Sequence, residues 1–210
     1  MSIELKEMVT CPQCGKDSKF IVWNSLNGDI DPDAKQQLLD GTLFVFECPH
    51  CGHSTNLFYP ILYHDMKNKT MVYFTGEESV ERAKMAFNDT VNKIGFSLSN
   101  HRMRIVTDQN ALREKAIIFE NQLDDRVIEI IKLLYFANAQ KQCPDVHITD
   151  AYFLIANGKY LLQLIGERDL SAEFNSELYE KIQAQFVAPL VNDDEMSIDM
   201  DWAQQVLTRE

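Results

Sequence analysis

The chain has 210 residues, of which 45% are hydrophobic and 25% charged, and its formal net charge is −12 at neutral pH. This composition is ordinary for a globular protein, and no apolar run approaches the roughly 20 residues of a membrane-spanning helix. The acidic excess is largest after residue 141, where 4 Lys and Arg stand against 13 Asp and Glu. Because nucleic-acid binding needs a footprint of Lys and Arg, we expect neither nucleic acid nor a membrane as a partner.

The N-terminal segment, residues 1–6, is polar and charged and does not look like a secretory signal peptide. We therefore expect a cytoplasmic protein. In that reducing compartment disulfides are rare, so its cysteines call for another explanation.

Four of the five cysteines form two matching motifs, Cys11-Pro12-Gln13-Cys14-Gly15 and Cys48-Pro49-His50-Cys51-Gly52. Two residues separate the thiols in each, so a single turn can direct both sulfurs inward, with proline fixing φ and glycine permitting positive φ. Two such pairs supply the four thiolates of a tetrahedral Zn²⁺ site, which leaves no open position for catalysis. The motifs predict one structural Zn²⁺ per chain, bound by Cys11, Cys14, Cys48 and Cys51.

Other interpretations of the cysteines remain open. A rubredoxin-like iron site uses the same ligands, and a Cys48/Cys51 redox dithiol is a second alternative, although it leaves the first pair unexplained. His50 and His53 are surplus to a complete ligand set and are predicted to be solvent-exposed, with His53 as a substitute ligand in the minor alternative. Cys143 stands alone and is predicted to be a buried or loop thiol.

Short strands and one helix are expected around the two motifs. A strand over 18–26 follows the first motif, and Asp31-Pro32 predicts a helix that Gly41 ends, with Asp31 as its cap. A strand over 42–47 leads to the second motif, and strands over 54–63 and 70–75 are expected to form a hairpin. The arrangement predicts a zinc-ribbon-like β module with an inserted helix.

Helices are expected to pack against this module. Apolar periodicity predicts a helix over 79–94, and a short strand over 101–106 follows it. Thr107 is expected to cap a helix that reaches about residue 121, and Asp124 to begin another.

The last part of the chain is expected to be smaller and also mixed. Asn157-Gly158 between two apolar runs predicts a hairpin, and helices are expected to open at Ser171 or Asn175 and near Asp201. We therefore predict an α+β protein, with a zinc-binding domain over 1–140 and a C-terminal α+β subdomain over 145–210.

Tyr63-His64-Asp65 is the strongest candidate for catalysis, because a histidine beside an aspartate can act as a general base. Neighbouring residues of a strand point to opposite faces, however, so a turn-capping Asp65 and a surface His64 are favoured. Asp124-Asp125 is interpreted as a helix cap, and the carboxylates of 193–201 as a solvated loop. With no recognised catalytic motif, we predict no catalytic and no cofactor-binding residues beyond the metal ligands.

Several blocks of the sequence together resemble one family. They are the two cysteine motifs, the helix after Asp31-Pro32, the segment 57–65 and the stretch 104–129. They are similar to the bacterial and archaeal CpXC domain proteins, a resemblance that covers roughly residues 8 to 135. It implies zinc binding through the four cysteines and an activity that is uncharacterised.

Taken together, the residues predict a non-enzymatic zinc-binding scaffold that works through a protein partner or through self-association. The apolar strands Phe58–Tyr63 and Tyr160–Ile165 are candidate dimer faces, unless they are buried on both sides. A redox protein, using iron or the Cys48/Cys51 dithiol, is the alternative.

Overall fold

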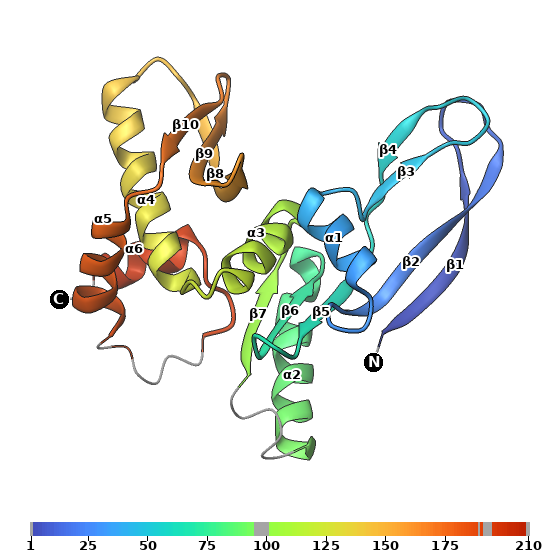
Figure 1. Ribbon diagram of the computed structural model, residues 1–210, viewed down its shortest axis with the longest axis horizontal. Coiled ribbons are helices and arrows are strands. Elements are labelled where there is room, and N and C mark those ends of the chain that lie inside the picture. The colour runs from blue at the N-terminus through green and yellow to red at the C-terminus, as the bar shows by residue number, and fades with distance from the viewer. Residues whose placement is uncertain (1, 95–100, 189, 191–194, 209–210) are drawn as a thin grey trace. The chain divides into compact units, whose positions relative to one another are not determined.

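The computed structural model describes residues 2–94, 101–188, 190 and 195–208 (Figure 1). Its contacts divide the chain into two compact units, residues 1–116 and 117–210, and the helix α3 (Gln109–Glu120) crosses the division. Helices and sheets occur in both, so the predicted α+β class is confirmed. The domain boundary expected near residues 140–145 concerns independent folding and stays a prediction.

A five-stranded mixed sheet in the order β1-β2-β5-β6-β7 forms the centre of the first unit. Its strands are β1 (Ile3–Thr10), β2 (Asp17–Asn27), β5 (Ile61–Asp65), β6 (Thr70–Phe74) and β7 (Arg102–Val106). The pairs β1–β2 and β5–β6 are antiparallel, whereas β2–β5 and β6–β7 are parallel. Along β5 the buried and half-buried residues alternate, because successive side chains of a strand point to opposite faces.

A second, two-stranded sheet of the first unit consists of β3 (Val45–Glu47) and β4 (Ser54–Asn56). The helix α1 (Pro32–Asp40) lies between β2 and β3 in the chain, and Gly41 ends it in the left-handed conformation, as predicted. After β6 come a short 3₁₀ turn, η1 (Glu77–Ser79), and the helix α2 (Val80–Ile94). The predicted helix inserted between the two cysteine motifs is therefore present.

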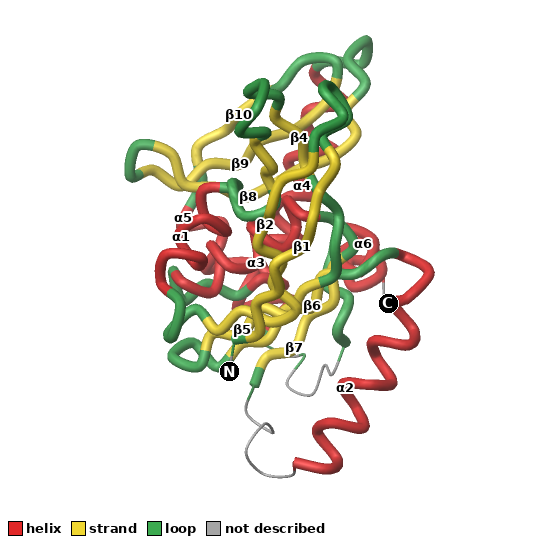
Figure 2. The backbone as a smooth tube through the Cα atoms, turned by 90° about the vertical axis from the view of Figure 1, so that its right-hand side faces the viewer, coloured by secondary structure: helices red, strands yellow, loops and turns green. Residues whose placement is uncertain are grey.

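The second unit combines helices with an antiparallel sheet in the order β10-β9-β8 (Figure 2). Its elements are α4 (Asp125–Gln142), β8 (Ile148–Ala156), β9 (Lys159–Gly166), β10 (Leu170–Glu173), α5 (Ser176–Ile182), a π-helical turn η3 (Gln183–Val187) and α6 (Met200–Thr208). The helix α4 packs against β8, α5 and α6. A core cluster of Ile148, Ala151 and Leu164 is covered by partly buried apolar residues that include Phe136 of α4.

Most predicted elements are present, and the differences have local causes. The chain expected as one strand over 54–63 is two strands, because the segment 57–60 leaves β3 and passes to the large sheet. The strand expected over 42–47 is shorter, because residues 42–44 form a turn. The strands β1 and β10 were not predicted at all.

Two predicted helix caps need correction, and one is confirmed. The side chain of Asp31 makes no capping hydrogen bond. Asp108, and not Thr107, accepts hydrogen bonds from the first N–H groups of α3, at 2.8 and 2.9 Å. Asn175, the second of the two expected start positions, caps α5.

None of the helices in the described part of the chain is both long enough and apolar enough to cross a membrane.

Candidate metal centre

The two cysteine motifs occupy equivalent places at the tips of two hairpins. Residues 11–16 connect β1 to β2, and residues 48–53 connect β3 to β4. The last strand pairs before the turns are Thr10 with Asp17 and Glu47 with Ser54. Each hairpin thus presents one pair of thiols at its end.

The backbone of the two turns is the same. In each turn the N–H of the first cysteine donates to the carbonyl five residues on, and the glycine N–H donates back to the first cysteine's carbonyl, at 2.8–3.0 Å. Gly15 and Gly52 have φ of 70° and 72°, which a side chain would strain. The predicted role of these glycines is therefore confirmed.

The four sulfur atoms form a compact group. All four Sγ atoms lie within 4.8 Å of one another, and the distances Cys11–Cys51 and Cys14–Cys48 are both 3.7 Å. A tetrahedral ion with bonds of about 2.3 Å separates its sulfurs by about 3.8 Å, whereas a disulfide bond is about 2.05 Å long. The cysteines are free thiols, and their positions fit a shared metal ion.

The group has a buried side and an exposed side. Cys11 and Cys48 are each 1% exposed, and with Phe46 they form a small core cluster. Val9, Phe20 and Leu57 pack against this cluster, whereas Cys14 and Cys51 are exposed. The first cysteine of each motif therefore belongs to the core, and the second faces solvent.

Aromatic rings connect this cluster to the central sheet. Phe46 contacts Phe20 edge to face, with 6.1 Å between ring centroids, and Phe20 contacts Tyr59 at 6.4 Å. Phe44 contacts Tyr59 at 4.8 Å and Phe74 of β6 at 5.6 Å. Burial raises the pKa of Tyr59 to about 12. Since edge-to-face contacts are favourable, these rings join the β3–β4 hairpin to the central sheet.

The thiols do not ionise independently. Burial opposes ionisation of Cys48, but hydrogen bonds from the N–H groups of His50 and Cys51 and from neighbouring thiols lower its pKa to about 7. The His53 N–H favours the Cys51 thiolate, yet partial desolvation beside the other thiols and the hydrogen bonds among the sulfurs raise its pKa to about 12. A bound cation would offset the negative charge that four thiolates bring together.

The remaining thiol and histidine candidates lie outside this group. His50 is exposed and His53 is half-buried, and neither joins the cysteine cluster within the residues that the structure describes. Cys143 is half-buried and follows the last residue of α4.

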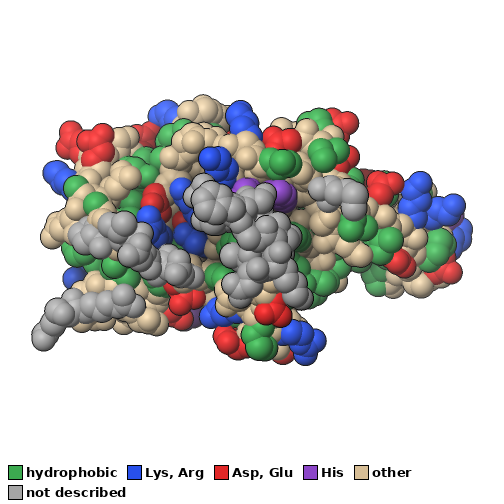
Figure 3. Space-filling view, turned by 90° about the horizontal axis from the view of Figure 1, so that it is seen from below, with side chains coloured by type: hydrophobic (Ala, Val, Ile, Leu, Met, Phe, Trp, Pro, Cys, Tyr) green, Lys and Arg blue, Asp and Glu red, His purple; other side chains and the backbone are tan. Residues whose placement is uncertain are grey.

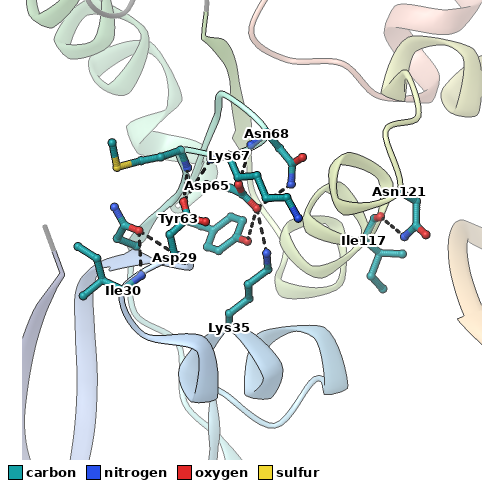
Figure 4. A network of polar contacts seen from close by, with 11 residues as sticks. Asp29, Ile30, Lys35, Tyr63, Asp65, Lys67, Asn68, Ile117 and Asn121 are labelled. Carbon is teal, nitrogen blue, oxygen red and sulfur yellow. Dashed lines mark hydrogen bonds and ion pairs between the residues drawn. The ribbon is translucent and has the colours of Figure 1, made fainter.

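Asp65 is the centre of a buried polar network (Figure 4). Its carboxylate, 2% exposed, accepts from Lys35 Nζ at 3.0 Å, from the Asn68 N–H at 2.8 Å and from Asn68 Nδ2 at 2.9 Å. Burial opposes the charge, but these hydrogen bonds hold its pKa below the usual value. Asp65 caps the turn after β5, as predicted.

His64 points away from this network and lies beside His101, with 5.4 Å between the ring centroids. Histidine side chains gather in one place on the face seen from below (Figure 3). Burial lowers the pKa of both imidazoles, and the neighbouring His101 adds to the effect on His64. His64 is half-buried, so it lies only partly at the surface where it was expected. A His64–Asp65 dyad is not formed.

Two of the other acidic candidates, Asp124 and Asp199, act as helix caps. Asp124 accepts from the Arg126 N–H at 3.0 Å and pairs with its guanidinium at 2.8 Å, which confirms the predicted cap of α4. Asp199 accepts from the Trp202 N–H at 2.8 Å at the start of α6. Residues 193 and 194 lie outside the described residues.

Sequence reasoning missed the partner of Asp65. Lys35 was treated only as part of a helix, although it is the one basic residue of α1. The single cation on this short helix is the signal that could have indicated an ion pair, but it does not identify the carboxylate partner.

Comparison with known families agrees with the site. The family model described as CpXC protein matches residues 9–132. The match covers more than half of the chain and both cysteine motifs, so the chain belongs to the CpXC family, and the resemblance seen in the sequence is confirmed. It ends within α4, before the sheet of the second unit. No curated protein and no solved structure matches the chain.

Proposed function

We propose that this CpXC protein binds one Zn²⁺ through Cys11, Cys14, Cys48 and Cys51 and that the ion is structural. The observation that carries the proposal is the cross-motif spacing of 3.7 Å between sulfurs of the two hairpin tips. Four thiolates complete a tetrahedral shell, so the ion would hold the hairpins together without offering a position for substrate.

The small size of the second cysteine hairpin, β3–β4, supports a structural ion. The strands β3 and β4 have three residues each, and an isolated two-stranded hairpin is marginally stable in water. Metal binding to such a module contributes directly to its folding free energy. The ion would therefore stabilise these short strands, as a larger apolar core stabilises longer ones.

The sulfur contacts also bear on the redox alternatives. The contacts of 3.7 Å join cysteines of different motifs, whereas a dithiol reaction needs the two sulfurs of Cys48 and Cys51 to bond to each other. This favours a shared ion over a Cys48/Cys51 dithiol. The same four sulfurs would also accept iron, so metal identity has to be measured.

The working role that we propose is that of a cytoplasmic interaction or scaffold protein. The described candidates for acid–base chemistry serve structural roles: Asp65 holds a turn, and Asp124 caps a helix. Exposed apolar side chains on the first unit, Met8 and Phe58 among them, support contact with another protein surface.

Metal analysis of protein purified without added metal tests the proposal. We expect one zinc per chain, a colourless solution, and the same zinc content after Cys143→Ser, the matched control for a thiol outside the cluster. Cys14→Ser changes an exposed ligand and is expected to lower zinc content sharply. Iron with visible absorption bands would establish the redox alternative, and a metal-free folded protein would refute the structural ion.

A further inference from the structure

The outer edge of β1 is open. In the sheet order β1 is the first strand and pairs with β2 alone, and within the described part of the first unit no strand covers its other edge (Figures 1 and 2). Seven of its residues are exposed and Val9 is half-buried. Such an edge presents unpaired N–H and C=O groups that another strand can bind.

The side chains along this edge are partly apolar. Ile3, Leu5 and Met8 of β1 are 44%, 40% and 59% exposed, and Ile21 of β2, opposite Lys6, is 43% exposed. Glu4, Lys6 and Glu7 lie between them. Charged residues on an edge strand discourage indiscriminate pairing, so a partner strand fits best where opposite charges face Glu4 and Lys6 and no like charges face each other.

A second copy of β1 meets this condition in one register. In an antiparallel pair, residues directly opposite each other share a face, so a two-fold axis must place one residue opposite its own copy. An axis at Glu4, Lys6 or Glu7 opposes like charges. An axis at Leu5 places Leu5 opposite the partner's Leu5, and Glu4 opposite the partner's Lys6 on both sides of the axis.

We propose that the protein self-associates through β1, paired antiparallel with β1 of a second copy about a two-fold axis at Leu5, so that the two sheets continue into each other. This rests on the proposed function, in that it names a second copy as the partner of the scaffold. Isologous pairing of one patch with itself is the commonest closed symmetry of homo-oligomers.

The substitutions that test this interface lie far from the metal centre. Cys11 lies six residues along the chain from Leu5, about 20 Å at strand geometry. A variant at the interface therefore leaves the cysteine cluster intact, and association and zinc content can be measured separately on the same samples.

Sedimentation equilibrium of the full chain tests the proposal. The wild-type protein is expected to be dimeric. Glu4→Lys places Lys opposite Lys twice, and Lys6→Glu places Glu opposite Glu twice, so each should weaken dimerisation about tenfold or more. The double variant Glu4→Lys/Lys6→Glu restores opposite charges and should return the dissociation constant to within about threefold of wild type.

Glu7→Lys is the matched control, because it makes the same charge change at a residue opposite the partner's Ile3 and should leave the dimer nearly unchanged. Leu5→Lys, at the axis, should abolish it. A wild-type monomer at every concentration, equal losses in Glu4→Lys and Glu7→Lys, or no rescue in the double variant would overturn the proposal. A protein that dimerises but contains no zinc would instead refute the structural ion and leave the proposed interface supported.

Discussion

The second cysteine hairpin, β3–β4, and the sheet of the second unit are both built from antiparallel strands, but they differ in strand length and in the core that they pack against. The strands β3 and β4 have three residues each, and two of the three buried members of their core cluster, Cys11 and Cys48, are candidate metal ligands. The strands β8 and β9 have nine and eight residues and pack through an apolar cluster on α4. The difference is the reason why the proposed metal ion is expected to stabilise one region and not the other.

The turns of the two regions also differ in what fixes their conformation. Asn157-Gly158 has φ of 52° and 73°, which suits a tight two-residue turn that fixes its hairpin locally. The six-residue cysteine turns are longer and depend on sulfur positions supplied by two separate hairpins. One region is therefore specified by local turn chemistry, and the other by a contact between distant parts of the chain.

The largest effect is expected from Cys48→Ser, which removes a buried ligand. Zinc binding should be lost, and because the free energy of structural zinc binding, about 10–16 kcal/mol in small modules, is folding free energy, the cysteine hairpins should unfold. Zinc content together with near-ultraviolet circular dichroism measures both. Cys143→Ser should change neither, and a folded, zinc-free Cys48→Ser protein would contradict the account.

Phe153→Ala tests the opposite region. Phe153 is 1% exposed and contacts the rings of Tyr160 and Phe174, so its truncation should destabilise the protein by about 3–5 kcal/mol in chemical denaturation while zinc content stays unchanged. Ile155→Ala, on the same strand but 36% exposed, is the control and should cost less than about 1.5 kcal/mol. Release of zinc by Phe153→Ala would show that zinc binding depends on the core of the second unit, which contradicts the proposed difference between the two regions.

Lys35→Met should cost about 3 kcal/mol at neutral pH, because it leaves the buried Asp65 carboxylate without its cation. The pKa of Asp65 is lowered in the folded state, so its stabilising effect is present above the unfolded value of about 3.8 and is lost as pH falls through the folded value. The difference in the free energy of unfolding between Lys35→Met and wild type should therefore become smaller below about pH 4. Urea denaturation at several pH values measures it.

Lys84→Met is the matched control for that experiment, since Lys84 pairs with a largely exposed Glu81 at 3.4 Å and exposed pairs contribute about 0–1 kcal/mol. A pH-independent difference for Lys35→Met would mean that the lysine acts by packing and not by its charge.

The smallest effects are expected at the turn glycines. A Cβ at Gly15, Gly52 or Gly158 would meet no atom within 4 Å, so alanine should cost only the strain of positive φ, about 1–2 kcal/mol. The variants should differ in zinc affinity. Gly15→Ala should weaken zinc affinity, whereas Gly158→Ala should not. Competition with a chromophoric chelator measures the affinity, and equal zinc affinity in all three variants would contradict the role assigned to the cysteine turns.

Much of this organisation could be predicted from the sequence. The motif spacing, the proline and glycine of each turn and the Asn-Gly turn act locally, and local geometry places them as predicted. The α+β class and the inserted helix followed from the same kind of signal. The four cysteines came together because each motif already directs two sulfurs to one side.

The features that were not predicted are an edge strand and contacts between distant parts of the chain. The alternation Ile3, Leu5, Val9 was present in the sequence, yet β1 was overlooked because its charged residues were taken only as evidence against a signal peptide. The segment 57–60 leaves one sheet for another, which no local propensity specifies. His64 is half-buried because His101, from a distant segment, lies against it.

The central claim, that metal stabilises the cysteine hairpins while an apolar core stabilises the second unit, is tested most directly by hydrogen exchange before and after chelation. Peptides from residues 9–56 should lose protection when the metal is removed, whereas peptides from 148–166 should keep it. Equal loss in both regions, or no loss in the cysteine hairpins, would contradict the account.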